Sequence, residues 1–172
     1  MYATALKENA PKTAESVAKL ANLIRYMQND IDKDFILLEN EINYVKDYIS
    51  IQKLRLAIAP KTITTFEVDE GATISPGLLI PLVENAFKYG IHPTKTSIIT
   101  ISITTKERQI SFYCENQYDE NLKIHQMNEG FGIGIENVKK RLQLIYPKQH
   151  TFEILKENNI FSVQLTITNN TI

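Results

Sequence analysis

The sequence is poor in the residues that mark several classes of protein. Its 172 residues include one cysteine, Cys114, which excludes an internal disulfide framework and fits a reducing compartment. Cys114 and the three histidines (His92, His125 and His150) do not have the spacing of a metal site, so we expect structural or surface roles for them. No apolar run approaches the roughly 20 residues that cross a bilayer, and we expect no signal peptide at the start.

Charge of neither sign is in excess. The chain has 19 lysines and arginines against 20 aspartates and glutamates, a formal net charge of -1. A generic nucleic-acid-binding domain normally has a basic surplus, so the balance gives this class no support. The 43% of hydrophobic residues is ordinary for a globular protein, and the length suffices for one domain with a hydrophobic core and a helical appendage.

The first sixty residues have the periodicity of helices. Residues 12–29 contain neither glycine nor internal proline, and Pro11 before them suits a first helical turn. A second helix is predicted over about 38–57, where apolar residues repeat for nearly three heptads with Gln52 at one seam position. This pattern fits two alternatives equally: an amphipathic helix packed on its own domain, or a helical hairpin that pairs with a second copy.

From Pro60 onward the pattern is one of strands interrupted by two helices. Strands are predicted over 62–68, 97–105, 109–116, 151–156 and 160–168, and helices over 76–88 and 134–146. Ser75 and Pro76 predict the N-cap and first turn of the earlier helix. Hairpins interrupted by helices favour an α+β two-layer sandwich, in which helices cover one face of a mixed sheet. Strict βαβ alternation is missing, which disfavours a dinucleotide-binding fold.

Two asparagines interrupt otherwise apolar faces. Asn116 ends the inward-facing row of the 109–116 strand, where its amide either is capped by loop backbone or meets a ligand such as a nucleobase edge. Asn85 lies close to the apolar stripe of the 76–88 helix, where it either bonds backbone or supplies an oxygen to Mg²⁺. Lys88, three residues later, is either solvated or faces phosphate.

Glycine is scarce, but half of it lies within five residues. Of the six glycines, Gly130, Gly132 and Gly134 lead into the predicted 134–146 helix. Free backbone N–H groups and the helix dipole at such an N-terminus favour an anion such as phosphate. A glycine turn can also simply link two elements, so the motif gains weight from the polar loop before it and the amphipathic helix after it.

Three stretches together resemble a known family. PLVENAFKYG (81–90) resembles the N box of histidine-kinase-type ATPases, and GFGIGIENVKKRL (130–142) resembles their second glycine box. Residues 21–56 resemble the segment before the ATPase domain in sensor histidine kinases of the LytS/YehU type. The resemblance implies a Bergerat-type ATP-binding fold with ATP and Mg²⁺. It also implies phosphoryl transfer to a histidine on a helical dimerisation region and then to a LytTR-type response regulator.

The resemblance also implies roles for individual residues. Asn85 matches the magnesium-ligating asparagine, and Lys88 matches a residue near the phosphates, so these two are the candidate catalytic residues. Asn116 stands where the family has an aspartate that meets the adenine amino group. The remaining candidates for nucleotide binding are Tyr89, Gly130, Gly132, Gly134, Asn137 and Arg141.

The sequence departs from the family pattern in four places. CENQYDE (114–120) lacks the D-x-G-x-G box, so Asn116 brings no charge, and Tyr89 stands where many relatives have histidine. Pro81 stands one turn before Asn85, where a hydrolase would need a carboxylate base, which favours a kinase over an ATP hydrolase. The phosphoacceptor box is absent. We therefore expect a partial dimerisation region over 1–59 and an ATP-binding domain over 60–172 of a kinase fragment.

Two other functions remain open at this stage. The chain fits a non-catalytic interaction module with the same fold and a degraded nucleotide site, which the missing glycines after Asn116 support. It also fits an ATPase or anti-sigma-type serine kinase of the GHKL superfamily, against which the helical hairpin argues. For the kinase, we expect a homodimer through the helical region. We also expect a cytoplasmic location beneath a membrane anchor, without direct membrane contact or nucleic-acid binding by this fragment.

Overall fold

The computed structural model describes residues 1–118 and 133–168 of the chain. The helices in this part are α1 (Tyr2–Lys7), α2 (Pro11–Asn29), α3 (Leu38–Arg55), α4 (Ile80–Tyr89) and α6 (Ile133–Ile145). The strands are β1 (Ile36–Leu37), β2 (Lys61–Glu67), β3 (Thr73–Ile74), β4 (Ile98–Lys106), β5 (Gln109–Gln117), β6 (His150–Glu157) and β7 (Ile160–Thr168). The long elements agree with the sequence-based prediction, whereas α1, β1 and β3 are too short to have left a periodic signal.

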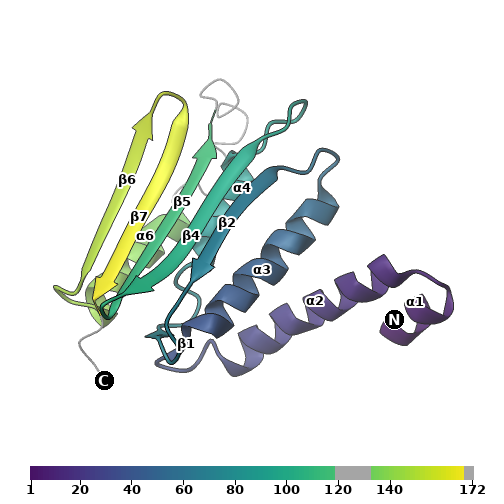
Figure 1. The fold of residues 1–172 in the computed structure, drawn as a ribbon, viewed down its shortest axis with the longest axis horizontal. Helices are drawn as coiled ribbons and strands as arrows, with labels where there is room; N and C mark the ends of the chain where they lie inside the picture. Colours follow the sequence, from purple (N-terminus) through teal and green to yellow (C-terminus); the bar gives the residue numbers. More distant parts are fainter. Residues whose placement is uncertain (119–132, 169–172) are drawn as a thin grey trace.

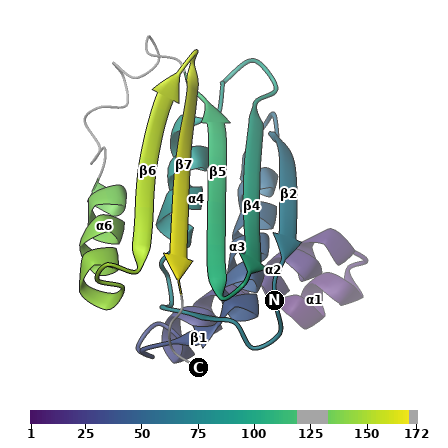
Figure 2. The ribbon, with the colours of Figure 1, turned by 60° about the vertical axis from the view of Figure 1, so that its left-hand side comes forward.

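Five strands form a mixed sheet in the order β2-β4-β5-β7-β6, visible from β6 to β2 in Figure 2. The β2–β4 pair is parallel, and the other three pairs are antiparallel. The β4–β5 and β6–β7 hairpins turn through Glu107–Arg108 and Asn158–Asn159, and all four of these residues have positive φ. Positive φ at both central residues is the geometry of a type I′ turn, which suits the twist of the strands.

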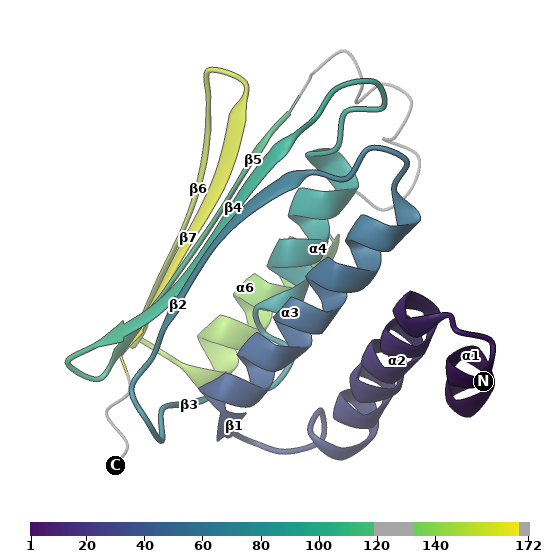
Figure 3. The same cartoon turned by 45° about the vertical axis from the view of Figure 1, so that its right-hand side comes forward.

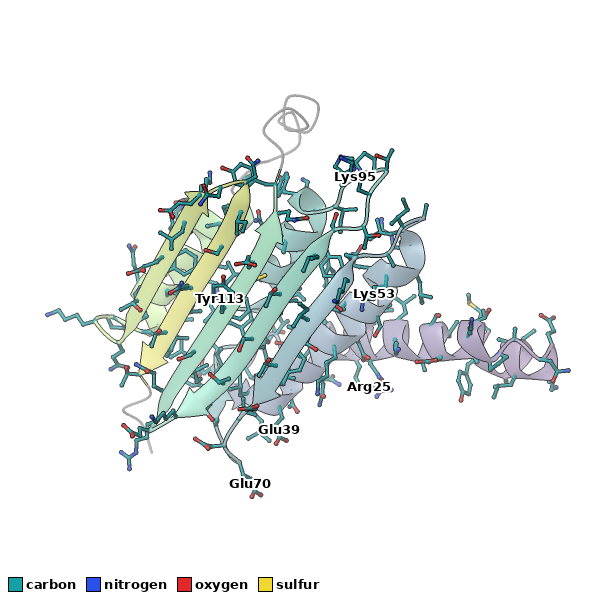
Figure 4. The ribbon with its side chains drawn as sticks, turned by 45° about the horizontal axis from the view of Figure 1, so that its top comes forward. Arg25, Glu39, Lys53, Glu70, Lys95 and Tyr113 are labelled. Carbon is teal, nitrogen blue, oxygen red and sulfur yellow. The ribbon has the colours of Figure 1, made fainter. Side chains whose placement is uncertain are left out.

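The molecule has two layers, as predicted. Helices α3, α4 and α6 lie against one face of the sheet, and α2 lies beyond α3 (Figures 1 and 3). No described helix covers the other face. Tyr113 projects from β5 on that face (Figure 4), and its hydroxyl donates to the carboxylate of Glu115 at 2.5 Å. The α+β sandwich with a mixed sheet and a helical N-terminal part is thereby confirmed.

The core lies between the sheet and the helices. Residues 99, 101 and 103 of β4 are isoleucines with no exposed surface. In the β4–β5 ladder they lie opposite Asn116, Cys114 and Phe112 of β5, respectively. Burial raises the pKa of the Cys114 thiol to about 12, so this thiol stays protonated at neutral pH. The alternation of apolar and polar residues in the sequence therefore marks the face that packs on the helices.

The two long N-terminal helices use their apolar residues differently. The seam of α3 is buried in the chain's own core, at Leu38, Ile42, Val45 and Ile49. This outcome favours the first of the two alternatives for α3. By contrast, the described apolar side chains of α2 at Leu20, Ile24 and Met27 are 48–58% exposed. The domain boundary near residue 60 stays a prediction, and α3, which precedes it, packs in the same helical layer as α4.

The start of α4 differs from the prediction. The helix begins at Ile80 rather than at 76, and no side chain caps its N-terminus. The backbone before it turns through Gly77, whose φ is +64°. The N–H groups of Gly77 and Leu79 donate to the carboxylate of Glu41, which belongs to α3. These donors are satisfied by a partner distant in sequence, which the local Ser-Pro pattern does not reveal.

Candidate nucleotide site

A cleft of about 470 Å³ opens between α3, α4 and the first turn of α6. These three helices lie side by side in Figures 1 and 3. Its described lining consists of Tyr48, Gln52, Arg55, Pro81, Glu84, Asn85, Phe87, Lys88, Tyr89, Gly134 and Ile135. The cleft thus brings together four of the residues selected from the sequence: Asn85, Lys88, Tyr89 and Gly134.

The periodicity of α4 decides which of its side chains reach the cleft. The helix buries Leu82, Val83, Ala86 and Phe87 against the core. The residues on its other side are spaced three and four apart, so Asn85 and Lys88 share one side of the helix with Pro81. Asn85 is partly buried, and Lys88 is exposed with its Nζ 5.3 Å from the centroid of the Tyr89 ring. Polar groups therefore project from an apolar helix only where it lines the cleft.

Glu84 adds a carboxylate to the cleft beside Asn85. Burial raises its pKa above the ordinary value of 4.5, because partial removal from water disfavours the charged form. The amide oxygen of Asn85 and the oxygens of Glu84 are the hard donors that Mg²⁺ prefers. No cluster of three or more His, Cys, Asp or Glu side chains occurs among the described residues. A magnesium ion at this donor set would therefore be held mainly by phosphate and water, and binding of the ion by Asn85 stays a prediction.

Asn116 lies against the C-terminal end of α4. Its side chain is 2% exposed, and its Nδ2 donates to the carbonyl of Gln117 at 2.8 Å. A Cβ atom added to Gly90 would lie only 2.5 Å from Cβ of Asn116, so the β5 strand and the end of the PLVENAFKYG motif are in direct contact. Asn116 is not among the described residues that line the cleft. The amide is thus bonded to backbone, at the last residue of its own strand rather than in a loop, and a contact with adenine stays a prediction.

The remaining candidates lie in different surroundings. Gly130 and Gly132 lie outside the described residues. Asn137 is exposed on α6 and is not among the described cleft residues. Arg141 donates to the carbonyl oxygens of Gly77 at 3.2 Å and Pro76 at 2.7 Å, and to Oγ of Ser75 at 2.9 Å. It therefore holds the segment before α4, and nucleotide contacts by these residues stay predictions.

Three residues of α3 that were not selected from the sequence also line the cleft. Tyr48 packs edge-on against Phe87 with ring centroids 5.9 Å apart, and Arg55 donates to Oε1 of Gln52 at 3.4 Å. The only signal in the sequence was Gln52, a polar residue at an otherwise apolar seam position. Arg55 and Lys88 place two cations at one cleft, an arrangement that favours a polyanion.

The sequence has relatives among the sensor kinases. A family profile described as Histidine kinase matches residues 1–58. Sensor histidine kinase YpdA of Escherichia coli is 32% identical over 149 residues, which are 79% of this chain and 26% of YpdA. Sensor protein kinase HptS of Staphylococcus aureus (strain USA300) is 32% identical over 162 residues, which are 87% of this chain and 31% of HptS. The chain thus spans less than a third of either relative.

Solved structures share the fold at low sequence identity. The histidine kinase AdeS of Acinetobacter baumannii has a TM-score of 0.54 and 12% identity, over 95% of this chain and 82% of that one. The histidine kinase domain of the blue-light activated EL346 from Erythrobacter litoralis has a TM-score of 0.55 and 14% identity, over the same shares of the two chains. In the part of the chain that the structure describes, no helix combines the length and apolarity that a membrane span requires. The family profile and the two relatives support the interpretation that the chain is a C-terminal fragment of a sensor histidine kinase.

Proposed function

We propose that the chain is the ATP-binding catalytic part of a two-component sensor histidine kinase. It transfers the γ-phosphoryl group of ATP to a histidine outside these residues, from which the group passes to a LytTR-type response regulator. One observation carries the proposal: residues from two motifs, Asn85 and Lys88 of the first and Gly134 of the second, line one cleft.

In this proposal, different side chains contact the metal ion, the phosphates and the purine of the bound nucleotide. Asn85 would hold Mg²⁺ through its amide oxygen, and the ion would supply charge neutralisation at the phosphates. Lys88 and Arg55 approach the phosphates from α4 and α3, and the purine lies toward Asn116 and Gly90 at the end of α4. Phosphoryl transfer needs positioning and charge neutralisation more than a strong base. Apolar Pro81 lines the cleft one turn before Asn85, which favours transfer to an imidazole over attack by water.

Replacing Asn85 by alanine is the direct test of this function. We expect the wild-type chain to bind Mg-ATP in a calorimetric titration and Asn85→Ala to bind it at least about tenfold more weakly, a loss of about 1.4 kcal/mol. Asn43→Ala is the control, because Asn43 is exposed on α3 and is not among the described residues of the cleft. No detectable binding by the wild-type chain at millimolar nucleotide would reject the proposal. A longer piece that carries the phosphoacceptor histidine should form an acid-labile, base-stable phosphoryl group.

Arg55 offers a second test that involves neither sequence motif. A charge-assisted hydrogen bond contributes about 1.5–3 kcal/mol, so we expect Arg55→Ala to raise the Kd for Mg-ATP roughly tenfold. Lys53→Ala is the matched control, since Lys53 is in the same helical turn and is not among the described cleft residues. We expect it to change the Kd less than about twofold. Equal effects of the two substitutions would indicate general electrostatics rather than a contact with phosphate.

Two features bear on the partners and on the second candidate function. The exposed stripe of Leu20, Ile24 and Met27 on α2 is an apolar surface that supports the proposed homodimer through the helical region. The uncharged Asn116, already bonded to the Gln117 carbonyl, favours the alternative of a non-catalytic interaction module. Under either function, we propose a cytoplasmic location for this part of a membrane-anchored protein. The Mg-ATP titration separates the two functions.

A further inference from the structure

A buried hydrogen-bond network joins α2 to the segment that leads into α4. Glu41, in the first turn of α3, has no exposed surface. Its Oε1 accepts a hydrogen bond from the N–H of Leu79 at 3.0 Å, and its Oε2 accepts one from the N–H of Gly77 at 2.9 Å. The hydroxyl of Tyr26, on α2, donates to Oε2 and lies 2.8 Å from the nitrogen of Gly77. One carboxylate therefore holds three elements together.

The same segment is also held by α6 and by the residue that follows it. Arg141 donates to the oxygens of Ser75, Pro76 and Gly77, and Oη of Tyr146 accepts from the N–H of Ser75 at 2.8 Å. The segment 75–79 continues directly into α4, which carries the polar side chains of the cleft. A displacement of this segment therefore moves the cleft lining.

A carboxylate is an unusual choice for this position. Burial of a charge is unfavourable, and it raises the pKa of Glu41. Complete pairing offsets this cost only when α2, α3 and segment 75–79 hold their observed arrangement. The backbone of the segment is constrained as well, because Gly77 has a φ of +64°, a conformation that residues with a side chain rarely adopt. The geometry of the network is thus specific as well as buried.

Tyr26 is the main attachment of α2 in this network. Among the described residues of α2, Ala14 and Tyr26 alone are buried. The Tyr26 ring stacks on the ring of Tyr44 with centroids 4.2 Å apart, and its hydroxyl reaches the buried carboxylate. The hydroxyl of Tyr26 therefore links α2 directly to segment 75–79 through hydrogen bonds.

We propose that Tyr26 and Glu41 form a latch that couples the docking of α2 to the geometry of the nucleotide cleft. Glu41 is a positioning residue that acts through segment 75–79 and does not itself touch nucleotide. The inference rests on the proposed function and adds a regulatory input to it. Because coupling between two sites is reciprocal, undocking of α2 weakens nucleotide binding, and bound nucleotide tightens the docking of α2 by the same factor.

The test compares Tyr26→Phe with Tyr44→Phe in the full chain. Tyr26→Phe keeps the ring contact with Tyr44 and removes the hydroxyl, whereas Tyr44→Phe removes a neighbouring hydroxyl that makes none of the hydrogen bonds to Glu41. Two quantities are measured: the Kd for Mg-ATP, and the hydrogen-exchange rate of the α2 backbone amides with and without Mg-ATP. We expect Tyr26→Phe to raise the Kd roughly 3- to 10-fold, within the usual range of coupling factors, and to abolish protection of α2 by nucleotide. Tyr44→Phe should behave as wild type.

The outcomes separate the latch from the function on which it rests. If the wild-type chain binds Mg-ATP and Tyr26→Phe binds it with the same Kd, the latch is wrong and the proposed function stands. The latch is also wrong if the wild-type chain binds Mg-ATP but the α2 amides exchange no more slowly with nucleotide than without it. This measurement uses the wild-type chain, so it does not depend on how well the variant folds. A wild-type chain that binds no Mg-ATP overturns the proposed function, and the latch with it.

Discussion

Replacing Glu41 by alanine is expected to destabilise the folded chain by about 2–4 kcal/mol, through two buried donors that lose their acceptor and a new cavity. The Leu79 N–H loses its acceptor, and the Tyr26 hydroxyl loses the carboxylate to which it donates. The N–H of Gly77 can still donate to the hydroxyl oxygen of Tyr26. The loss should appear as a lower free energy of unfolding in urea, followed by circular dichroism.

Glu39→Ala is the matched control for this substitution. Glu39 lies in the same first turn of α3 but is exposed (Figure 4), so its removal should change the free energy of unfolding by less than about 0.5 kcal/mol. Similar effects of the two substitutions would mean that the carboxylate acts only through its position near the helix N-terminus. The network would then contribute nothing measurable to stability.

The pH dependence of stability gives an independent check of the buried carboxylate. Burial raises the folded-state pKa of Glu41 above 4.5, so the folded chain holds this proton more tightly than the unfolded chain does. The contribution of the group is therefore most favourable below pH 4.5 and declines as the pH rises through the folded-state pKa. The stability of wild type relative to Glu41→Gln should accordingly fall as the pH rises from about 4.5 through the folded-state pKa. A constant difference would contradict the raised pKa.

Replacing Gly90 by alanine is expected to destabilise the chain by about 1–3 kcal/mol or more, because the new atom overpacks a closed contact. Its Cβ would lie 2.5 Å from the carbonyl oxygen of Ala86 and 2.5 Å from Cβ of Asn116. Both neighbours are held in place, the first by helix α4 and the second by strand β5. Either the last turn of α4 or the Asn116 side chain must move, so affinity for Mg-ATP should fall together with stability.

Gly134→Ala separates this steric effect from the general effect of adding a methyl group. Among the described residues, a Cβ atom on Gly134 would meet only Cβ of Pro81, at an ordinary 3.6 Å. Since alanine favours helix over glycine, this substitution should leave the free energy of unfolding unchanged or raise it by up to about 1 kcal/mol. Thermal unfolding of both variants decides the matter. A Gly90→Ala chain as stable as Gly134→Ala would show that the contact with Asn116 is loose.

The sequence predicted those elements whose partners follow from local pattern. Alternation in β4 and β5 identified the buried face, and the apolar stripe of α4 identified the helix that packs on it. The family motifs identified Asn85, Lys88, Tyr89 and Gly134, which the structure brings to one cleft. Periodicity reports which side of an element is buried, so it succeeds where burial alone decides the structure.

The features that were missed depend on partners distant in the sequence. The four-residue delay in the start of α4 follows from Glu41, a charged residue that pattern alone places on the surface of its helix. The hydrogen bonds of Arg141 to the oxygens of segment 75–79 were also missed, and its assignment to nucleotide stays a prediction. The place of Arg55 in the cleft was missed because the helix that carries it was assigned to dimerisation.

The central position of the β5–β7 pair has a consequence for the order of assembly. The β4–β5 and β6–β7 hairpins each close through a two-residue turn and can form locally. Joining them requires the chain between β5 and β7, including α6, to close into a long loop, which is the slower step. Since α6 supplies one wall of the cleft, we expect nascent or half-folded molecules to have no affinity for nucleotide until the two halves of the sheet have met.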